Sequence, residues 1–288
     1  MQKPQNPSKN HHYIPEFFIK GFVNENKKVY VYDKIKDRID KREFSAASIC
    51  YIEHGNTITH DSKQFTVLEN IYHNLEEYSK NAVKTFTTVI DVPDEHTQSD
   101  LRKLLLFINQ IFWRTPANDD YANSLIERYR EKHPDWKTFV EDGTTFVNFS
   151  IDDRLKMIKL TLPSEILLRD ENNLKARTKY VSIQSNGPYL LSDNPIIYPI
   201  KPFSAVDFTE KIIFPINKHR LYVSTTESTQ KTIGPAELML INVQFIVQAR
   251  QYVIGDDYED LHAFVDAYRM VRDSDMDLAR YLFEIIAN

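Results

Sequence analysis

The sequence predicts an α+β fold: a helical core with an N-terminal β-hairpin and a small, mainly antiparallel sheet. Apolar residues recur at helical spacing up to about residue 177, and short strand-like runs divided by Gly, Pro and Asn follow over about 178–225. Helical patterns then return toward the C-terminus. Strands and helices that occupy separate stretches favour α+β over alternating α/β. We expect residues 1–9 to be a disordered lead-in and residues 10–288 to form a single α+β domain.

The N-terminal part is predicted to hold a short helix and a hairpin. A proline suits the first turn of a helix and a glycine suits its C-cap, so we expect a helix over Pro15–Lys20. Tyr and Val alternate over Lys28–Tyr32, a polar turn follows, and Arg38–Phe44 is expected to return as the hairpin partner. Another extended segment is expected over Cys50–Ile58.

Longer helices are predicted from apolar residues spaced three and four apart, first over Val67–Ile90. Thr97–Asp100 matches a capping box, and Leu101–Arg114 follows as a helix that is apolar almost all round. Such a helix is usually buried, so we expect it to be the most buried long helix. Further helices are expected over Tyr121–His133, Asp152–Leu168 (bent at Pro163), Pro235–Gln251, Leu261–Met270 and Leu278–Ile286.

Short strands are predicted between the two helical parts. These runs are rich in Val, Ile, Tyr and Phe, and turn-forming residues bound each of them. They cover Tyr180–Gln184, Tyr189–Leu191, Ile196–Ile200, Lys211–Phe214 and Leu221–Ser224.

Composition limits the classes of function. The formal charge of −5 and the pI near 6.0 argue against general electrostatic attraction to nucleic acid, although a locally basic cleft stays compatible with them. Cys50 is the only cysteine, which fits a reducing, cytoplasmic setting. The sequence has no apolar run long enough for a membrane span, so we expect no membrane partner.

Common cofactor and catalytic motifs are absent from the sequence. It contains no GxGxxG, no GxxxxGK[ST], no HExxH, no CxxC and no GxSxG. No cofactor can therefore be assigned. His54, His60 and Asp61 have side chains of the kind that bind metals, but their spacing identifies no particular metal site.

The first candidate site is the histidine pair His11 and His12, followed by Tyr13 and Pro15. Histidine is the natural acid or base near neutral pH, and a proline-containing segment could hold the two rings on opposite sides. The alternative is structural: one ring bonds to the backbone and the other is solvated.

A second candidate lies at the end of the predicted buried helix. Gln110 and Arg114 are four residues apart and therefore share a face. A buried arginine must be paired, because an isolated buried charge is very costly. Arg114 could hold a substrate phosphate or carboxylate, or it could pair with Glu69, Glu76 or Asp193. Both interpretations stay open.

The third candidate is the SDNP sequence at Ser192–Pro195. Asp and Asn before Pro are strong turn formers, so a turn is the default interpretation of this motif alone. A carboxylate at the end of a strand, such as that of Asp193, is also a common place for a catalytic or orienting group.

Together, these motifs resemble the bacterial family known as domain of unknown function 4238. Its HYIPxF opening is matched by His12–Phe17, its QxxxRTP helix end by Gln110–Pro116 and its SDNP turn by Ser192–Pro195. A VYVYDK hairpin strand at Val29–Lys34 and an FPI segment at Phe214–Leu221 extend the similarity, which spans roughly Asn10–Gln251. The resemblance implies no established activity.

The predicted site comprises His11, His12, Gln110, Arg114, Ser192 and Asp193, converging in one pocket. A histidine base, an arginine that neutralises anionic charge and an orienting carboxylate suit phosphodiester cleavage. We therefore expect a phosphoester hydrolase, a nuclease-like effector with a role in bacterial toxicity or phage defence by analogy. A nucleotide or single-stranded nucleic acid is the expected substrate. The alternative is a non-catalytic protein that binds a ligand or a protein partner.

Overall fold

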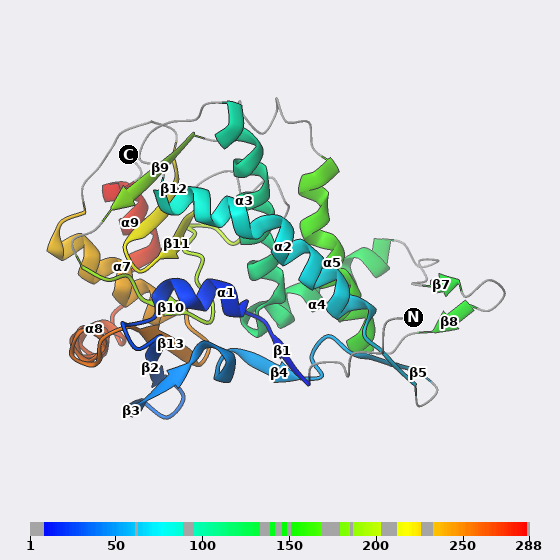
Figure 1. The fold of residues 1–288 in the computed structure, drawn as a ribbon, viewed down its shortest axis with the longest axis horizontal. Coiled ribbons are helices and arrows are strands. Elements are labelled where there is room, and N and C mark those ends of the chain that lie inside the picture. Colours follow the sequence, from blue (N-terminus) through cyan, green and yellow to red (C-terminus); the bar gives the residue numbers. More distant parts are fainter. Residues whose placement is uncertain are drawn as a thin grey trace.

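The computed structural model is an α+β structure in which long helices pack beside small antiparallel sheets (Figure 1). This arrangement confirms the fold class predicted from the sequence. The structure describes residues 9–60, 63–88, 95–132, 139–141, 146–148, 151–168, 179–184, 187–202, 212–225 and 233–286. Most of the expected lead-in lies outside these ranges.

The predicted helices are all present, with shifted ends. The short N-terminal helix is α1 (Glu16–Ile19), which Pro15 precedes and a 3₁₀ turn over Lys20–Phe22 extends. The remaining helices are α2 (Val67–Thr88), α3 (Glu95–Arg114), α4 (Asp119–Lys132), α5 (Ile151–Leu168, with Pro163 inside it), α7 (Pro235–Gln248), α8 (Tyr258–Val271) and α9 (Leu278–Ile286).

Helix α3 is the centre of the largest core. Every residue from 104 to 115 is buried, and α3 packs against both α2 and α5. Its deep burial confirms the expectation for Leu101–Arg114. The predicted capping box is wrong, because α3 begins at Glu95 and Thr97–Asp100 lie within the helix. Ser and Thr are tolerated in a helical turn, so their presence did not mark its start.

The largest sheet among the described residues has four strands, in the order β10–β13–β2–β3. Strands β2 (Lys28–Asp33) and β3 (Arg38–Ser45) are the predicted hairpin. Strand β13 (Tyr252–Gly255) pairs with β2 and with β10 (Leu191–Ser192). The prediction of helix as far as Gln251 is therefore wrong, because the chain leaves α7 at Gln248 to enter this sheet.

A second sheet has the order β11–β12–β9 and consists of β9 (Lys179–Gln184), β11 (Ile213–Asn217) and β12 (Arg220–Thr225). The strand predicted over Ile196–Ile200 is reduced to one isolated bridge between Ile197 and Ile213, and that over Tyr189–Leu191 is displaced to β10. Both segments are rich in turn residues, which limits regular pairing. The described part of the chain also contains three two-stranded sheets: β1 (Asn10–His12) with β4 (Tyr51–Glu53), β5 (Ile58–His60) with β6 (Lys63–Phe65), and β7 (Phe139–Glu141) with β8 (Phe146–Asn148).

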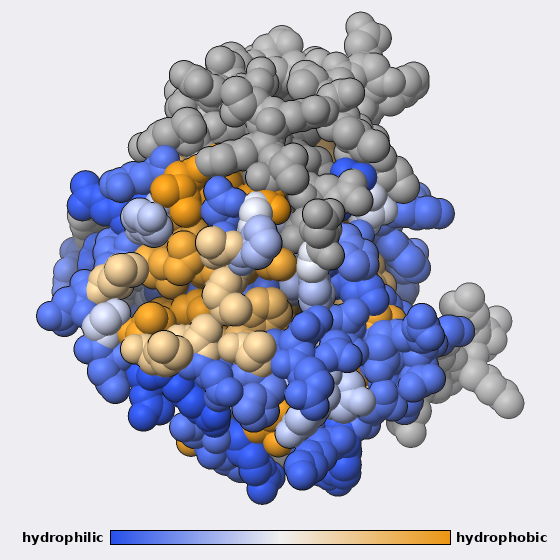
Figure 2. Space-filling model, turned by 90° about the vertical axis from the view of Figure 1, so that its left-hand side faces the viewer, coloured by the Kyte–Doolittle hydropathy of each residue, from blue (hydrophilic) through white to orange (hydrophobic). Residues whose placement is uncertain are grey.

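Hydrophobic side chains also gather on one outer face. Figure 2 shows them on the face that lies to the left in Figure 1, the side on which α7 is drawn. Residues of α7 and α9 that are only partly buried belong to the core beneath, among them Leu238, Met239, Leu240, Ala279 and Ile285. Among the helices that the structure describes, none is long and apolar enough to cross a membrane.

Candidate functional site

The two histidines of the opening motif lie on the strand β1 and face opposite ways. Successive side chains of a strand point to opposite faces, so His11 and His12 separate. In the pairing with β4, His11 lies opposite Ile52 and His12 lies opposite Tyr51. His11 is buried and reaches a polar pocket, whereas the ring of His12 contacts the ring of Tyr51 edge-on at 5.8 Å.

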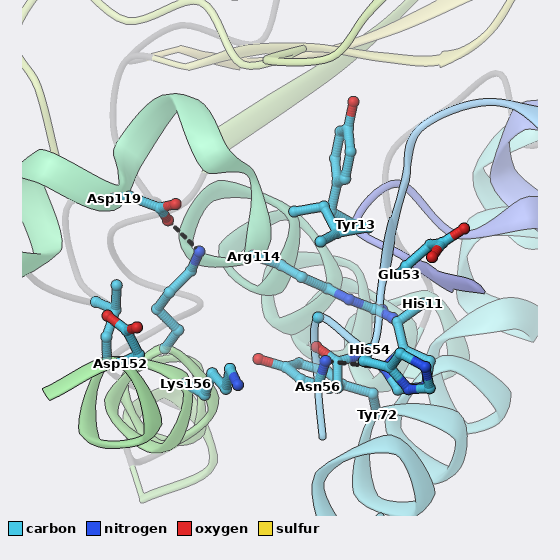
Figure 3. A pocket seen from close by; sticks show the side chains of 14 residues that line it. His11, Tyr13, Glu53, His54, Asn56, Tyr72, Arg114, Asp119, Asp152 and Lys156 are labelled. Carbon is cyan, nitrogen blue, oxygen red and sulfur yellow. Dashed lines mark hydrogen bonds and ion pairs between the residues drawn. The ribbon is translucent and has the colours of Figure 1, made fainter. Parts of the chain in front are cut away.

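The pocket has a volume of about 340 Å³ and is built from segments that are far apart in sequence (Figure 3). The β1–β4 pair and the turn after it form one wall, α2 and the end of α3 contribute a second, and α4 and α5 supply the third. Its polar lining comprises His11, Tyr13, Glu53, His54, Asn56, Tyr72, Arg114, Asp119, Asp152, Lys156 and Lys159.

A tight turn after β4 holds the two histidine rings of the pocket. The backbone N–H of Asn56 donates to Nδ1 of His11 at 2.8 Å, so this nitrogen carries no proton. Its 3.8 Å contact with Glu69 is therefore not an ion pair, and Glu69 instead accepts from the Asn56 side chain at 2.7 Å. His54 has a φ of 55°, a strained conformation for a non-glycine residue, and its ring lies 6.3 Å from that of His11.

Arg114 enters the pocket from the C-terminal turn of α3, as Figure 3 shows. Its guanidinium forms an ion pair with Glu76 of α2 and stacks on the ring of Tyr72 at 4.3 Å. This pairing confirms the expectation that a carboxylate neutralises Arg114, and it identifies Glu76 among the named partners. The Nε of Arg114 is buried and has no hydrogen-bond partner among the described residues.

Two lysines of α5 complete the basic part of the pocket. Lys156 donates to the backbone carbonyl of Thr57 at 2.7 Å and pairs with Asp153 at 3.2 Å, whereas Lys159 pairs with Asp119. Burial lowers the pKa of Lys159, and the charge of Asp119 only partly opposes this effect. The ammonium group of Lys159 therefore releases its proton more readily than an exposed lysine.

Each cation of the pocket is paired with a carboxylate. The exposed side-chain fractions are 6% for Arg114, 12% for Lys159 and 28% for Lys156, and those of their partners are 20% for Glu76, 34% for Asp119 and 7% for Asp153. An anionic ligand therefore has to exchange with one of these carboxylates, and Asp119 is the most exposed of the three.

His12 does not line the pocket, but it is close enough to Arg114 and Glu76 for their charges to affect its pKa. Partial burial is the main cause that lowers the pKa of His12, and the charge of Arg114 adds to this effect. The ring forms a hydrogen bond with the backbone of Ala47. Its Nε2 is buried and unpartnered within the described residues, so Nδ1 makes that bond. The arrangement fixes the orientation of the ring.

Gln110 lies one turn before Arg114 on α3 and is also absent from the pocket lining. It is 3% exposed, and its side-chain nitrogen finds no partner in the described part of the chain. Ser79 of α2 is fully buried with an unpartnered hydroxyl as well. Such groups are usually satisfied by water or by a ligand.

The side chain of Asp193 stabilises the turn that follows α7. Its carboxylate accepts from the backbone N–H groups of Arg250, Gln251 and Tyr252 at 2.8, 2.8 and 3.0 Å. Burial raises the pKa of Asp193, and these three hydrogen bonds act in the opposite direction. The hydroxyl of Thr115 donates to the Asp193 carbonyl, which ties the end of α3 to the SDNP turn.

The structure thus brings His11 and Arg114 together in the pocket and leaves His12 and Gln110 beside it. Ser192, a buried residue of β10, and Asp193 belong to the sheet and its turn. The catalytic assignment of all six residues stays a prediction. Sequence reasoning missed Asp119, Lys156 and Lys159, and it weighed His54 only as a metal ligand. No feature of the sequence predicts the positive φ of His54. Lys156 and Lys159 occupy positions that look, in the sequence, like ordinary solvent-exposed positions of a helix.

A metal site is not evident in the described ranges: no group of three or more His, Cys, Asp or Glu side chains there is placed to hold a metal ion. Asp61, one of the residues considered for this role, lies outside those ranges.

Comparison with known proteins supports the family resemblance. The model of a family described as "Protein of unknown function (DUF4238)" matches residues 10–259. The chain belongs to this family. The DUF4238 match covers all three walls of the pocket, from β1 to α5, together with the SDNP turn and β13. No match was found among curated proteins or among solved structures.

Proposed function

We propose that this DUF4238 protein is a phosphoester hydrolase whose active site is the pocket around Arg114. The observation that carries the proposal is the convergence of three cations and two histidines, supplied by four separate elements, in one pocket. Arg114, Lys156 and Lys159 bind the phosphoryl oxygens and stabilise the charge that develops in the transition state. The proposed reaction uses side chains of the pocket and no cofactor.

The position of the acid–base groups suits an in-line displacement. His54 and Asp119 lie on opposite sides of the pocket with Arg114 between them (Figure 3), and Lys159 is paired with Asp119. In the proposed reaction, water attacks phosphorus and gives a proton to His54. The bond from phosphorus to the leaving oxygen breaks, and Lys159 supplies the proton that this oxygen takes up.

The experiment is hydrolysis of 4-nitrophenyl phosphate and bis(4-nitrophenyl) phosphate by the full chain. His54→Ala is expected to lower kcat by roughly 10²–10⁴-fold, the usual contribution of one acid–base group. Binding of inorganic phosphate should persist in this variant, because the three cations remain. His262→Ala is the matched control, since His262 is a half-exposed histidine of α8 that does not line the pocket. Equal loss of activity in both variants would remove His54 from the mechanism.

A second candidate function is recognition without catalysis. It is favoured by the fact that Arg114 and Lys159 already have carboxylate partners, Glu76 and Asp119. In this case a ligand would exchange with Asp119, which is the more exposed of the two acids. Binding of inorganic phosphate that Lys156→Met weakens, without turnover of either ester, would support this alternative and contradict the hydrolase.

A nuclease-like effector that acts in toxicity or phage defence is the narrower form of the proposal. It rests on analogy and on the suitability of the pocket for phosphodiesters. Growth arrest on expression of the natural chain, with normal growth on equal expression of His54→Ala, is the expected result. Arrest by both proteins would show that the pocket is not its cause.

A further inference from the structure

One face of the four-stranded sheet is covered by α8. The other face is buried in the main core at Val29, Val31 and Ile254 and is open at the end that carries Asp33, Arg38 and Tyr252, which we call the open sheet face. Tyr32, Ile39 and Val253 pack with residues of α8 on the covered face. In the strand register, Asp33 lies opposite both Arg38 and Tyr252, so these three side chains form a row on the other face. This face, with the segment Ser48–Tyr51 beside it, bounds a second pocket of about 410 Å³.

The second pocket combines aromatic rings with cations. Phe44, Tyr51 and Tyr252 supply the rings, and none of them is fully buried. Lys36 pairs with Asp33 at 2.9 Å, and Arg42 pairs with Asp40 at 2.9 Å while lying over the ring of Phe44. The guanidinium of Arg38 is exposed and forms neither a hydrogen bond nor an ion pair within the residues that the structure describes, although its charge contributes to the lowered pKa of the nearby Asp40.

We infer that this open sheet face binds the bases of a single-stranded nucleic acid. Tyr51 and Tyr252 offer ring faces on which bases stack, and Arg38 is available for the phosphate between them. Sheets that bind single strands combine these same two kinds of side chain. A free phosphate would need only the cations, and a peptide that added to the edge of β3 would need backbone groups rather than ring faces.

The inference rests on the proposed function, because it specifies the substrate of the first pocket. The two pockets lie on the two faces of β4: Tyr51 lines the second, and the next residue, Ile52, lines the first. Tyr13, which lines the first pocket, forms a hydrogen bond with Cys50, which lines the second. In the proposed complex, a single strand seated on the sheet passes round β4 and places a phosphodiester in the pocket of Arg114. A duplex cannot use this surface, because its bases are stacked and paired internally.

The test is binding of a fluorescently labelled oligothymidylate to the full chain, measured by anisotropy. Tyr51→Leu is expected to weaken binding roughly tenfold, a typical effect of losing one stacked base contact. Arg38→Gln is expected to weaken binding and to reduce its salt dependence, because one phosphate contact is lost. The matched controls are Tyr281→Leu and Arg280→Gln on α9, and Tyr281 is 44% exposed. The controls should bind as the natural chain does. Unchanged affinity in the first two variants, or an equal loss in the controls, would overturn the inference.

Two further measurements separate this inference from the proposed function. Hydrolysis of 4-nitrophenyl phosphate should stay unchanged in Tyr51→Leu and Arg38→Gln, because this small probe cannot span both pockets. If no ester is hydrolysed but the oligonucleotide follows the predicted pattern, the proposed hydrolase fails and the binding face stands. If the ester is hydrolysed but the oligonucleotide does not bind, the binding face fails alone. Equal affinity for the double-stranded form would also contradict base stacking.

Discussion

Arg114 and Glu76 form an ion pair that joins α3 to α2 at the edge of the pocket. The arginine is 6% exposed and the glutamate 20%, so each charge depends on the other for its stability in a partly dry site. The ring of Tyr72 lies against the guanidinium at 4.3 Å and shields the pair further. The pair thus supports the fold and positions a cation for a ligand at the same time.

Breaking this pair from one side should be costly. Arg114→Met is expected to lower the free energy of unfolding by about 3–5 kcal/mol, because it leaves the carboxylate of Glu76 half-buried without its partner. The double variant Arg114→Met with Glu76→Gln should recover part of the loss, since the unpaired charge is gone. Urea denaturation of the natural chain, both single variants and the double variant gives the coupling energy. Purely additive effects would show that the two side chains do not interact.

The core around α3 is expected to tolerate truncation poorly. Leu105→Ala or Ile108→Ala should destabilise the protein by about 2–5 kcal/mol, because both side chains are fully buried and leave a cavity. Thermal or chemical denaturation followed by circular dichroism measures the loss. Met270→Ala on α8 is the control, because Met270 is 86% exposed and should change little. Comparable losses at both kinds of position would contradict the central place of α3.

Asp193→Asn should destabilise the turn between α7 and β13. An amide has one acceptor oxygen in place of two, so at least one of the backbone N–H groups of Arg250, Gln251 and Tyr252 loses its acceptor. The expected cost is about 1–3 kcal/mol, as for a buried donor left unsatisfied. The measurement is the urea midpoint, with the exposed Asp275→Asn as control. A folded, equally stable Asp193→Asn variant without hydrolase activity would instead support the catalytic prediction for this residue.

The stability of the protein should depend on pH through His12. Burial lowers the pKa of His12 in the folded state below its ordinary value of 6.5, so the unfolded state binds the proton more readily. This difference in pKa contributes to the free energy of unfolding in full above pH 6.5, and the contribution is lost as the pH falls toward the pKa of His12 in the folded state. His12→Gln should therefore show a smaller fall in Tm on acidification than the natural chain. His73→Gln, at an exposed position of α2, should leave the slope unchanged. An identical slope in His12→Gln would mean that His12 does not titrate differently on folding.

The helices could be predicted from the sequence because their signal is local. The apolar spacing of α2, α3 and α9 is visible within each segment, and tertiary contacts moved only the ends. Strand β13 was missed, because its apolar residues directly follow a helical pattern and its partner strands β2 and β10 are distant in sequence. Likewise, β1 is too short to show a period, and only its pairing with β4 defines it.

The candidate site could be predicted only in part. His11 and Arg114 were identified because histidine pairs and buried arginines are unusual in themselves. Lys156 and Lys159 carry no such signal, and their place in the pocket follows from how α5 packs on α3. The SDNP motif predicted either a turn or a catalytic carboxylate at Asp193, and in the structure this carboxylate accepts hydrogen bonds from three backbone N–H groups. A local pattern does not reveal which partners a side chain meets after folding.

The order of strands in the largest sheet has a consequence for synthesis of the protein. Strand β13, at residues 252–255, lies between β10 and β2, so the strand that comes last in chain order among those the structure describes occupies an interior position. Until β13 is synthesised, the nascent chain carries a β2–β3 hairpin with one unpaired edge beside the apolar side chains that β13 will cover. Exposed strand edges invite association with other chains, and late closure of a distant pairing prolongs that exposure. Chains interrupted before Tyr252 should therefore depend on chaperones to stay dispersed.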